Sequence, residues 1–303
     1  MLYLILQIVK IYLEKMIKKM IYETINNYKK MNKESSLYSN KFNSYLAGLF
    51  EGKGHIWFPN LKKKKQQNPK FCLNFSLKNK TLVEKLIGII GYGVVLYRPN
   101  SNSCILVINS VKGLKKIIKH INGELRTPKI NQLYDLIDWL NYNHNSNIPK
   151  LHLKVKDLYE DSWFAGYIDV NGSFSIQHTT SEKNEKISCK LKIEELRYDP
   201  ITKLSYINIL TNIAKFLNCN LKLRKQVSTG YEYFKITASS RKSLVKIISY
   251  FDKFPLYTSK YLDYKDWKEA VILILNNKHS IDEGINRIDF IKNNMNLRKL
   301  RFN

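Results

Sequence analysis

Two similar stretches of sequence decide the fold: YLAGLFEGKG at residues 45–54 and WFAGYIDVNG at residues 163–172. Each carries an Ala-Gly pair inside an apolar run and ends in glycine. Small side chains let two helix backbones approach closely, so the stretches predict two helices packed against each other. The expected interface residues are Ala47, Gly48, Ala165 and Gly166. The terminal glycines, Gly54 and Gly172, predict left-handed helix stops that turn the chain into a strand.

A second repeat supports the same interpretation. LRTPK at residues 125–129 corresponds to LYTSK at residues 256–260, and a helical pattern with aromatic residues follows each of them. Two matches in the same order indicate an internal duplication. Short helix and strand patterns also alternate twice along the chain in the same order. We therefore predict an α+β fold, a pseudo-twofold duplication of a helix–strand–strand–helix–strand–strand–helix (αββαββα) unit with two antiparallel sheets.

Polar and Asn-rich segments give the expected domain boundaries. These are a basic helical leader at residues 1–41, a first half at 42–142, a linker at 143–159, a second half at 160–277 and a basic C-terminal tail at 278–303. The apolar run of the leader is shorter than the roughly 20 residues that a membrane-spanning helix needs. A targeting segment, a membrane-surface helix, an exon-fused segment and a helix packed on the body all stay open for it.

The composition narrows the class of protein. The chain has 51 Lys and Arg against 25 Asp and Glu, a formal net charge of +26, which indicates a polyanionic partner such as nucleic acid or an anionic membrane surface. An apolar content of 44% excludes the possibility that the whole chain is a disordered basic segment. The four cysteines are scattered without a CxxC pair, so we expect buried thiols and no zinc site. Abundant Lys, Asn, Ile and Tyr are typical of A/T-rich mitochondrial genomes, so a mitochondrial location is expected.

The opening stretches also carry a family resemblance. LAGLFEGKG and FAGYIDVNG resemble the two signature helices of the LAGLIDADG homing endonuclease and maturase family. The flanking NGELRTPK, LIDWLN and FPLYTSKYLDYKDW resemble segments of members encoded by mitochondrial group I introns, of the monomeric type with two motifs. The resemblance implies a pseudo-dimeric monomer whose two sheets form a saddle for nucleic acid. Its partner is then structured intron RNA, double-stranded DNA at the intron insertion site, or both, with no small-molecule substrate.

In this family the eighth motif residue of each half is an acid that holds divalent metal for phosphodiester hydrolysis. Here the eighth residues are Lys53 and Asn171. A protonated lysine cannot bind Mg²⁺ and an amide is a weak ligand, so we expect no metal site and DNA cleavage that is lost or weak. No cofactor is expected, apart from Mg²⁺ if endonuclease activity remains, and whether the chain is an enzyme stays open. Glu51 and Asp169 lie on another helix face and are expected to serve packing or helix-end hydrogen bonds.

The predicted strands alternate apolar residues with polar or basic ones, as in a half-buried antiparallel sheet. The resemblance implies that the polar face contacts base edges and phosphates. The expected contacts are His55, Trp57, Lys70 and Asn74 in the first half and Ser173, Ser175, Gln177, Ser188, Lys190, Lys192, Lys222, Arg224, Tyr233 and Lys235 in the second. An outward Trp57 either stacks on bases or is covered by the leader. Lys129 and Lys260 match the basic residue that in this family stabilises charge around the scissile phosphate, and they complete the expected catalytic centre.

The preferred hypothesis is an intron-encoded RNA maturase that assists splicing of a group I intron. Such a protein stabilises the folded intron through charge and shape and leaves the chemistry to the RNA. The alternative is a mitochondrial DNA endonuclease involved in intron homing. A third option is a non-enzymatic basic protein associated with ribosomal RNA or a membrane.

Overall fold

The structure is a computed structural model that describes residues 40–59, 67–181 and 184–295. Contacts divide the chain into residues 1–42 and residues 43–303, and the second unit contains both repeats. The predicted leader lies outside the described residues apart from its last two, which are helical, and so does the lysine-rich loop at residues 60–66. Within the described residues, no helix has the length and apolar character required to cross a bilayer.

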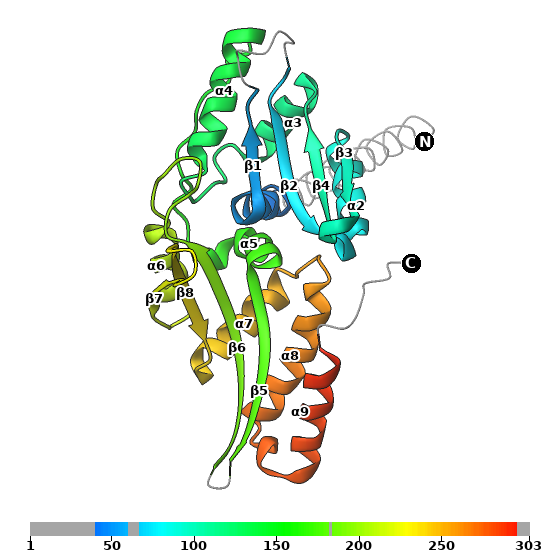
Figure 1. Cartoon of the computed structure of the whole chain (residues 1–303), viewed down its shortest axis with the longest axis vertical. Coiled ribbons are helices and arrows are strands. Elements are labelled where there is room, and N and C mark those ends of the chain that lie inside the picture. Colours follow the sequence, from blue (N-terminus) through cyan, green and yellow to red (C-terminus); the bar gives the residue numbers. More distant parts are fainter. Residues whose placement is uncertain (1–39, 60–66, 182–183, 296–303) are drawn as a thin grey trace, which may run out of the picture. The chain divides into compact units, whose positions relative to one another are not determined.

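The first repeat builds a four-stranded antiparallel sheet with strand order β1-β2-β4-β3 (Figure 1). It begins with the first signature helix, which ends at Lys53. The strands are β1 (Gly54–Trp57), β2 (Lys70–Ser76), β3 (Val94–Arg98) and β4 (Ser103–Ile108). The helices are α2 (Lys80–Ile90), α3 (Val111–Ile121) and α4 (Ile130–His144), with short 3₁₀ turns at Leu77–Asn79 and Pro99–Ser101.

The second repeat forms a sheet with the corresponding strand order, β5-β6-β8-β7. It begins with the second signature helix, α5 (Trp163–Asn171), after a 3₁₀ turn at Leu158–Glu160. The strands are β5 (Gly172–Ser181), β6 (Asn184–Leu196), β7 (Leu221–Lys225) and β8 (Glu232–Ala238). The helices are α6 (Ile207–Phe216), α7 (Arg241–Lys253), α8 (Lys260–Leu275) and α9 (Asp282–Asn294), with a 3₁₀ turn at Lys278–Ser280. The matching orders confirm the predicted α+β duplication.

Each sheet buries one face beneath its own helices. In β4 the side chains of Cys104, Leu106 and Ile108 are at most 1% exposed, as the period of two along a strand requires for a core face. The helices that follow the last strands begin with the same device in both halves. Ser110 Oγ accepts a hydrogen bond from the Gly113 amide in α3, and a serine cap starts α7 in the same way. The duplication therefore extends to local hydrogen bonding.

The terminal glycines of the two motifs do not adopt the left-handed conformation that the sequence predicted. Gly172 has φ −80° and ψ 160°, which is extended backbone, and Gly54 already belongs to β1. Glycine is required there for space. A Cβ on Gly54 would lie 2.5 Å from Phe50 Cδ2, and one on Gly172 would lie 2.6 Å from Ile168 Cγ2. The prediction was wrong because helix and strand join directly, with no turn between them.

The two signature helices pack backbone against backbone at their Ala-Gly pairs. A Cβ on Gly48 would lie 2.1 Å from the Trp163 carbonyl oxygen, and one on Gly166 would lie 2.1 Å from the Tyr45 carbonyl oxygen. Figure 1 shows α5 and the first signature helix between the two sheets. The two signature helices, and with them the two sheets, can lie this close only because Gly48 and Gly166 have no Cβ atom.

Two segments outside the predicted repeats are built into the fold. The linker follows the first half, where the Asn122 side chain donates to the Pro149 carbonyl at 2.8 Å. The predicted basic tail contains α9, which packs on β5 and α8 and buries Ile288 completely. The carboxylate of Asp289 lies 2.9 Å from His178 Nδ1 of β5. Helix α9 thus supports the long β5–β6 hairpin.

Replacing Gly48 with alanine is expected to lower the free energy of unfolding by at least about 2 kcal/mol, because overpacking forces the helices apart. Urea denaturation measures this loss. Gly88→Ala in α2 is the matched control, since no atom lies within 4 Å of its added Cβ. In that open helical position alanine is favoured by about 0.5–1 kcal/mol over glycine. Equal stability of the Gly48→Ala variant and the native protein would contradict the close packing.

Candidate active centre and nucleic-acid interface

The C-terminal ends of the two signature helices converge on one point. A Cβ on Gly52 would lie 2.2 Å from Val170 Cγ2, and these are the seventh motif residues of the two halves. The eighth residues, Lys53 and Asn171, follow directly, and Lys53 is exposed while Asn171 is half-buried. A cavity of about 290 Å³ opens beside them and is lined in part by Lys53, Lys129, Glu195 and Asp199.

The sixth residue of the first motif, Glu51, is completely buried and fully engaged in hydrogen bonds. Its carboxylate accepts from the amides of Arg126 at 2.9 Å and Thr127 at 2.5 Å. Across the interface it accepts from Trp163 Nε1 at 2.5 Å. Burial raises the pKa of Glu51, and these hydrogen bonds oppose the shift. The carboxylate is therefore part of the structure of the interface.

The second motif repeats this arrangement with Asp169. Its carboxylate accepts from the Tyr257 amide at 2.7 Å and from Thr258 Oγ1 at 2.5 Å. Across the interface it accepts from the Tyr45 hydroxyl at 2.6 Å. Tyr45 and Trp163 occupy the same place in their two motifs, so each half sends one donor to the acid of the other half. Both acids make the structural hydrogen bonds that the sequence analysis expected.

Lys129 and Lys260 each bind the end of the signature helix of their own half. Lys129 Nζ donates to the Gly54 carbonyl at 2.8 Å, and Lys260 Nζ donates to the Gly172 carbonyl at 2.5 Å. An ammonium group is favourable there because it meets the negative end of the helix dipole. Burial lowers the pKa of both lysines, to about 8 for Lys260. Their contact with a phosphate stays a prediction, since these carbonyls engage both ammonium groups.

The sequence analysis missed Glu195, near the end of β6. Its carboxylate accepts hydrogen bonds from the Asn171 side-chain amide and from the Tyr167 hydroxyl, the latter at 3.1 Å. Burial raises the pKa of Glu195, while the positive charges of Lys129 and Lys53 act to lower it. Asn171 is therefore held by a carboxylate of its own half.

The strand alternation did carry a signal for Glu195. Cys189, Leu191 and Ile193 of β6 are at most 1% exposed and point to the core. Glu195 is the next residue in this inward series, and a carboxylate at an inward position must find hydrogen-bond donors. An acid that breaks an apolar inward series beside a signature helix therefore marks a member of the centre.

The residues at the convergence point do not fit a divalent metal ion. Mg²⁺ and Ca²⁺ need several oxygen ligands, and carboxylates usually supply the charge. Lys53 instead brings a positive charge, and the side chain of Asn171 is engaged by Glu195. Among the residues that the structure describes, no group of three or more His, Cys, Asp or Glu side chains is arranged to hold a metal. No metal-dependent step is assigned to this centre.

The outward face of the second sheet is polar and basic. The strand register pairs Ser173 with Lys192 and Lys222 with Lys235, so these side chains project from the same face. All second-half contacts predicted from the sequence share this face. The sequence analysis missed Glu194, which lies there and forms an ion pair with Arg224 at 2.9 Å. The face therefore offers an excess of positive charge with one acid inside it.

The outward face of the first sheet has a different chemistry. It carries the predicted contacts His55, Trp57, Lys70 and Asn74. Trp57 is 39% exposed, and Lys70 Nζ lies 4.8 Å from the centre of its ring. The middle of the face is apolar, because Cys72, Ile105 and Val107 form a cluster that is only 6–7% exposed. This face is less suited to phosphate contacts than that of the second sheet.

Comparison with known proteins finds the same pair of motifs. A family model described as LAGLIDADG endonuclease matches residues 46–140 and 164–271. The intron-encoded DNA endonuclease aI3 of Saccharomyces cerevisiae is 30% identical over 295 residues, covering 86% of this chain and 71% of that protein. An uncharacterized cox1 intron-2 protein of Schizosaccharomyces pombe is also 30% identical, over 82% of this chain and 71% of its own length.

Solved structures share the fold. The LAGLIDADG homing endonuclease I-GzeII in complex with DNA target aligns with a TM-score of 0.61 at 19% identity, over 84% of this chain and 98% of the other. The meganuclease I-AabMI bound to uncleaved DNA aligns with a TM-score of 0.64 at 18% identity, over 84% and 99%. Identities this low establish the fold alone.

Glu51→Gln is expected to lower the free energy of unfolding by about 1–3 kcal/mol, because its new NH₂ group faces buried N–H donors. Urea denaturation measures the loss. Glu84→Gln is the control, since the Glu84 side chain is 49% exposed in an i,i+4 pair with Lys80. An exposed pair of this kind contributes about 0.3–0.5 kcal/mol. Equal losses in the two variants would show that Glu51 does not hold the interface.

Asn171→Asp places a second carboxylate against Glu195. Like charges at this distance force the pair to share a proton and raise its apparent pKa above the ordinary carboxyl range. Between about pH 4 and this raised pKa the folded state binds more protons than the unfolded state. The variant is therefore most stable below about pH 4, and it loses stability as pH rises through the raised pKa. A loss of about 1–3 kcal/mol is expected at pH 7, measured by urea denaturation.

Glu195→Gln in the same background removes the second charge and is expected to restore stability at neutral pH. The two single variants and the double variant form a cycle that isolates the contact. A loss that does not change with pH, or one that Glu195→Gln fails to relieve, would contradict the Asn171–Glu195 contact.

Proposed function

We propose a function from one premise: the chain belongs to the LAGLIDADG endonuclease family. It binds nucleic acid without cutting it and acts as a maturase that assists splicing of a group I intron in mitochondria. The observation that carries the proposal is the pair at the eighth motif positions. Lys53 opposes a metal cation, and Asn171 is held by Glu195. Cleavage chemistry is thereby removed from a scaffold that is otherwise complete.

The second sheet supports nucleic-acid binding. Its outward face presents Lys190, Lys192, Lys222 and Lys235 on neighbouring strands. Each lysine that neutralises a phosphate releases a counterion, which favours binding and makes it depend on salt. Polar side chains between the lysines supply donors and acceptors for base edges or ribose hydroxyls.

At the centre, Lys53 supplies positive charge without a bound metal. Its side chain is exposed at the end of the first signature helix, whereas the ammonium groups of Lys129 and Lys260 donate to backbone carbonyls. Lys53 is therefore placed to contact a backbone phosphate electrostatically. In a maturase the folded RNA performs the splicing chemistry, so a contact of this kind is sufficient.

A second candidate function is DNA cleavage for intron homing. The relative from Saccharomyces cerevisiae is named an intron-encoded DNA endonuclease, and both structural neighbours described above hold DNA. The names of the intron-encoded relatives, one from a cox1 intron, also support a mitochondrial location. The two functions differ in ligand and in metal dependence, so one set of assays separates them.

The maturase function predicts that the purified protein speeds splicing of the intron that carries this reading frame. With Mg²⁺ or Mn²⁺ it is expected to leave DNA that spans the insertion site intact. Lys190→Glu with Lys192→Glu is expected to lower the slope of log affinity against log salt by about 1.5, for two lost phosphate contacts. Filter binding over a salt series measures this change.

The control for binding is Lys115→Glu with Lys116→Glu on α3, which changes the net charge equally on an exposed helix surface. A specific double-strand break would support the homing function instead. Splicing at the same rate with and without the protein would overturn the maturase function. Binding that does not respond to salt would contradict both.

A further inference from the structure

We propose that the protein has a second surface for the sugar-phosphate backbone of structured RNA, between the linker and helices α6 and α7. This inference rests on the proposed maturase function and extends it. The surface is a hollow of about 700 Å³, here named the linker pocket. Its cationic lining residues are Arg126, Lys154, Lys156, Lys215 and Lys246.

In the part of the chain that the structure describes, the positive charges of the linker pocket form two groups: an inner pair that is bound to acids, and outer lysines that are not. Lys154 Nζ lies 2.9 Å from Asp161 Oδ2, and Arg126 Nη2 lies 2.8 Å from the same oxygen. Although burial acts to raise it, the pKa of Asp161 is held below its usual range by these two cations. The inner charges are thus largely balanced. The charge available to an anion comes from the outer lysines.

The outer lysines are Lys156, Lys215 and Lys246, and Lys156 and Lys215 are exposed. Within the described residues these three side chains form no ion pair with an acid. Lys246 Nζ lies 5.0 Å from the centre of the Phe216 ring, which holds the ammonium group at the pocket wall. Asp157 is the one acid that lines the described pocket, so the site is strongly positive.

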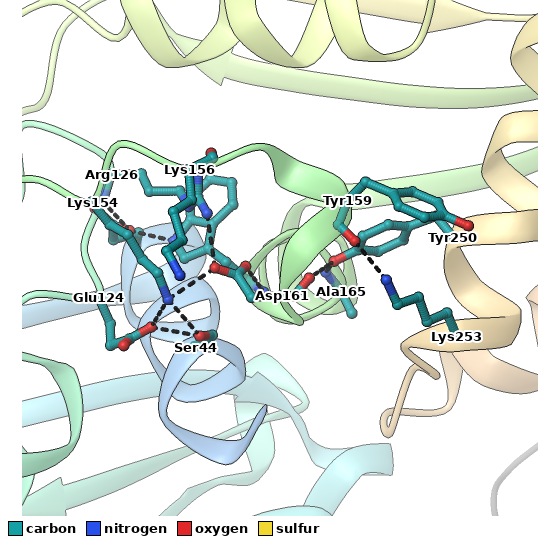
Figure 2. Close-up of polar contacts among 12 residues, drawn as sticks. Ser44, Glu124, Arg126, Lys154, Lys156, Tyr159, Asp161, Ala165, Tyr250 and Lys253 are labelled. Carbon is teal, nitrogen blue, oxygen red and sulfur yellow. Dashed lines mark hydrogen bonds and ion pairs between the residues drawn. The ribbon is translucent and has the colours of Figure 1, made fainter. Parts of the chain in front are cut away.

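The pocket is preorganised because the linker is anchored. Figure 2 shows Lys154 reaching Ser44, Glu124 and Asp161, at 3.2, 2.5 and 2.9 Å. Arg126 Nη1 donates a hydrogen bond to the Lys156 carbonyl, and this bond fixes the backbone that carries the Lys156 side chain. A surface already ordered before binding loses little conformational entropy when a ligand arrives.

Helix α6 adds polar groups suited to RNA. Asn208, Asn212 and Lys215 follow one another at helical spacing, so they share one exposed face of α6. Side-chain amides can donate to and accept from base edges and ribose 2′-hydroxyls.

The position of the pocket distinguishes RNA from duplex DNA. Helix α6 packs on β7 and β8, and the ring of Phe251 in α7 contacts that of Phe174 in β5, so both helices cover the inward face of the second sheet. The linker pocket therefore lies on the opposite side from the outward basic face. A short DNA duplex is stiff, with a persistence length of about 150 bp, and cannot follow both surfaces. A folded RNA has several helices and can occupy both.

The test is charge reversal in the pocket, Lys215→Glu with Lys246→Glu, in the full-length chain. Affinity for the intron RNA is expected to fall at least about tenfold near 0.1 M salt, with a salt slope lower by about 1.5. Affinity for duplex DNA is expected to stay unchanged. Lys115→Glu with Lys116→Glu on α3 is the control with the same change in net charge, and a thermal melt verifies folding.

Asn212→Lys provides a variant with the opposite sign. It exchanges one amide on the exposed face of α6 for a positive charge, and the gain of one phosphate contact is expected to make intron RNA bind about three- to fivefold more tightly. Equal effects of the pocket and α3 pairs, or equal weakening of duplex DNA, would overturn the second surface. If the native protein fails to bind intron RNA, the maturase function itself fails. If RNA binds but the pocket variants match the controls, only the second surface is excluded.

Discussion

The rest of the structure depends on a reciprocal exchange of hydrogen bonds between two buried acids. Glu51 of one half accepts from Trp163 of the other, and Asp169 accepts in return from Tyr45. Buried carboxylates are costly unless donors surround them, and here backbone amides of the same half provide the remainder. This requirement sets the register of the two signature helices. It also brings their backbones so close that Gly48 tolerates no side chain.

The same constraint separates folding from catalysis within each motif. Because the sixth residues satisfy the interface, the eighth residues can change without loss of the fold. Lys53 gains a favourable position at the negative end of its helix. Asn171 forms a hydrogen bond with Glu195 that an aspartate could not form without a shared proton. Exchange at the eighth positions is therefore compatible with the fold, and in the proposed function it removes metal binding and keeps the scaffold that binds nucleic acid.

Sequence patterns predicted features that depend on one element and its period. The alternation in β6 correctly placed Lys190 and Lys192 on the outward face, because a strand has a fixed period of two. The pattern could not show that Cys72 forms an apolar outward patch, since a continuous apolar run does not reveal which face is buried. Gly54 was misread because a left-handed turn and a close contact select the same residue. Periodicity marks Glu195 as an acid in an inward series, but its hydrogen bond with Asn171 joins distant elements, so the pattern could not identify this partner.

In the proposed function, the distribution of charge follows from the loss of cleavage at the centre. A metal-dependent nuclease concentrates positive charge at two scissile phosphates. Here the ammonium groups of Lys129 and Lys260 donate hydrogen bonds to carbonyls, and Lys53 is an exposed cation at the convergence point. Affinity must then come from many phosphate contacts spread over wide surfaces, and each contributes a modest, salt-dependent share. Such binding suits a ligand that has to be held in shape, because a folded RNA offers backbone on several sides and performs its own chemistry.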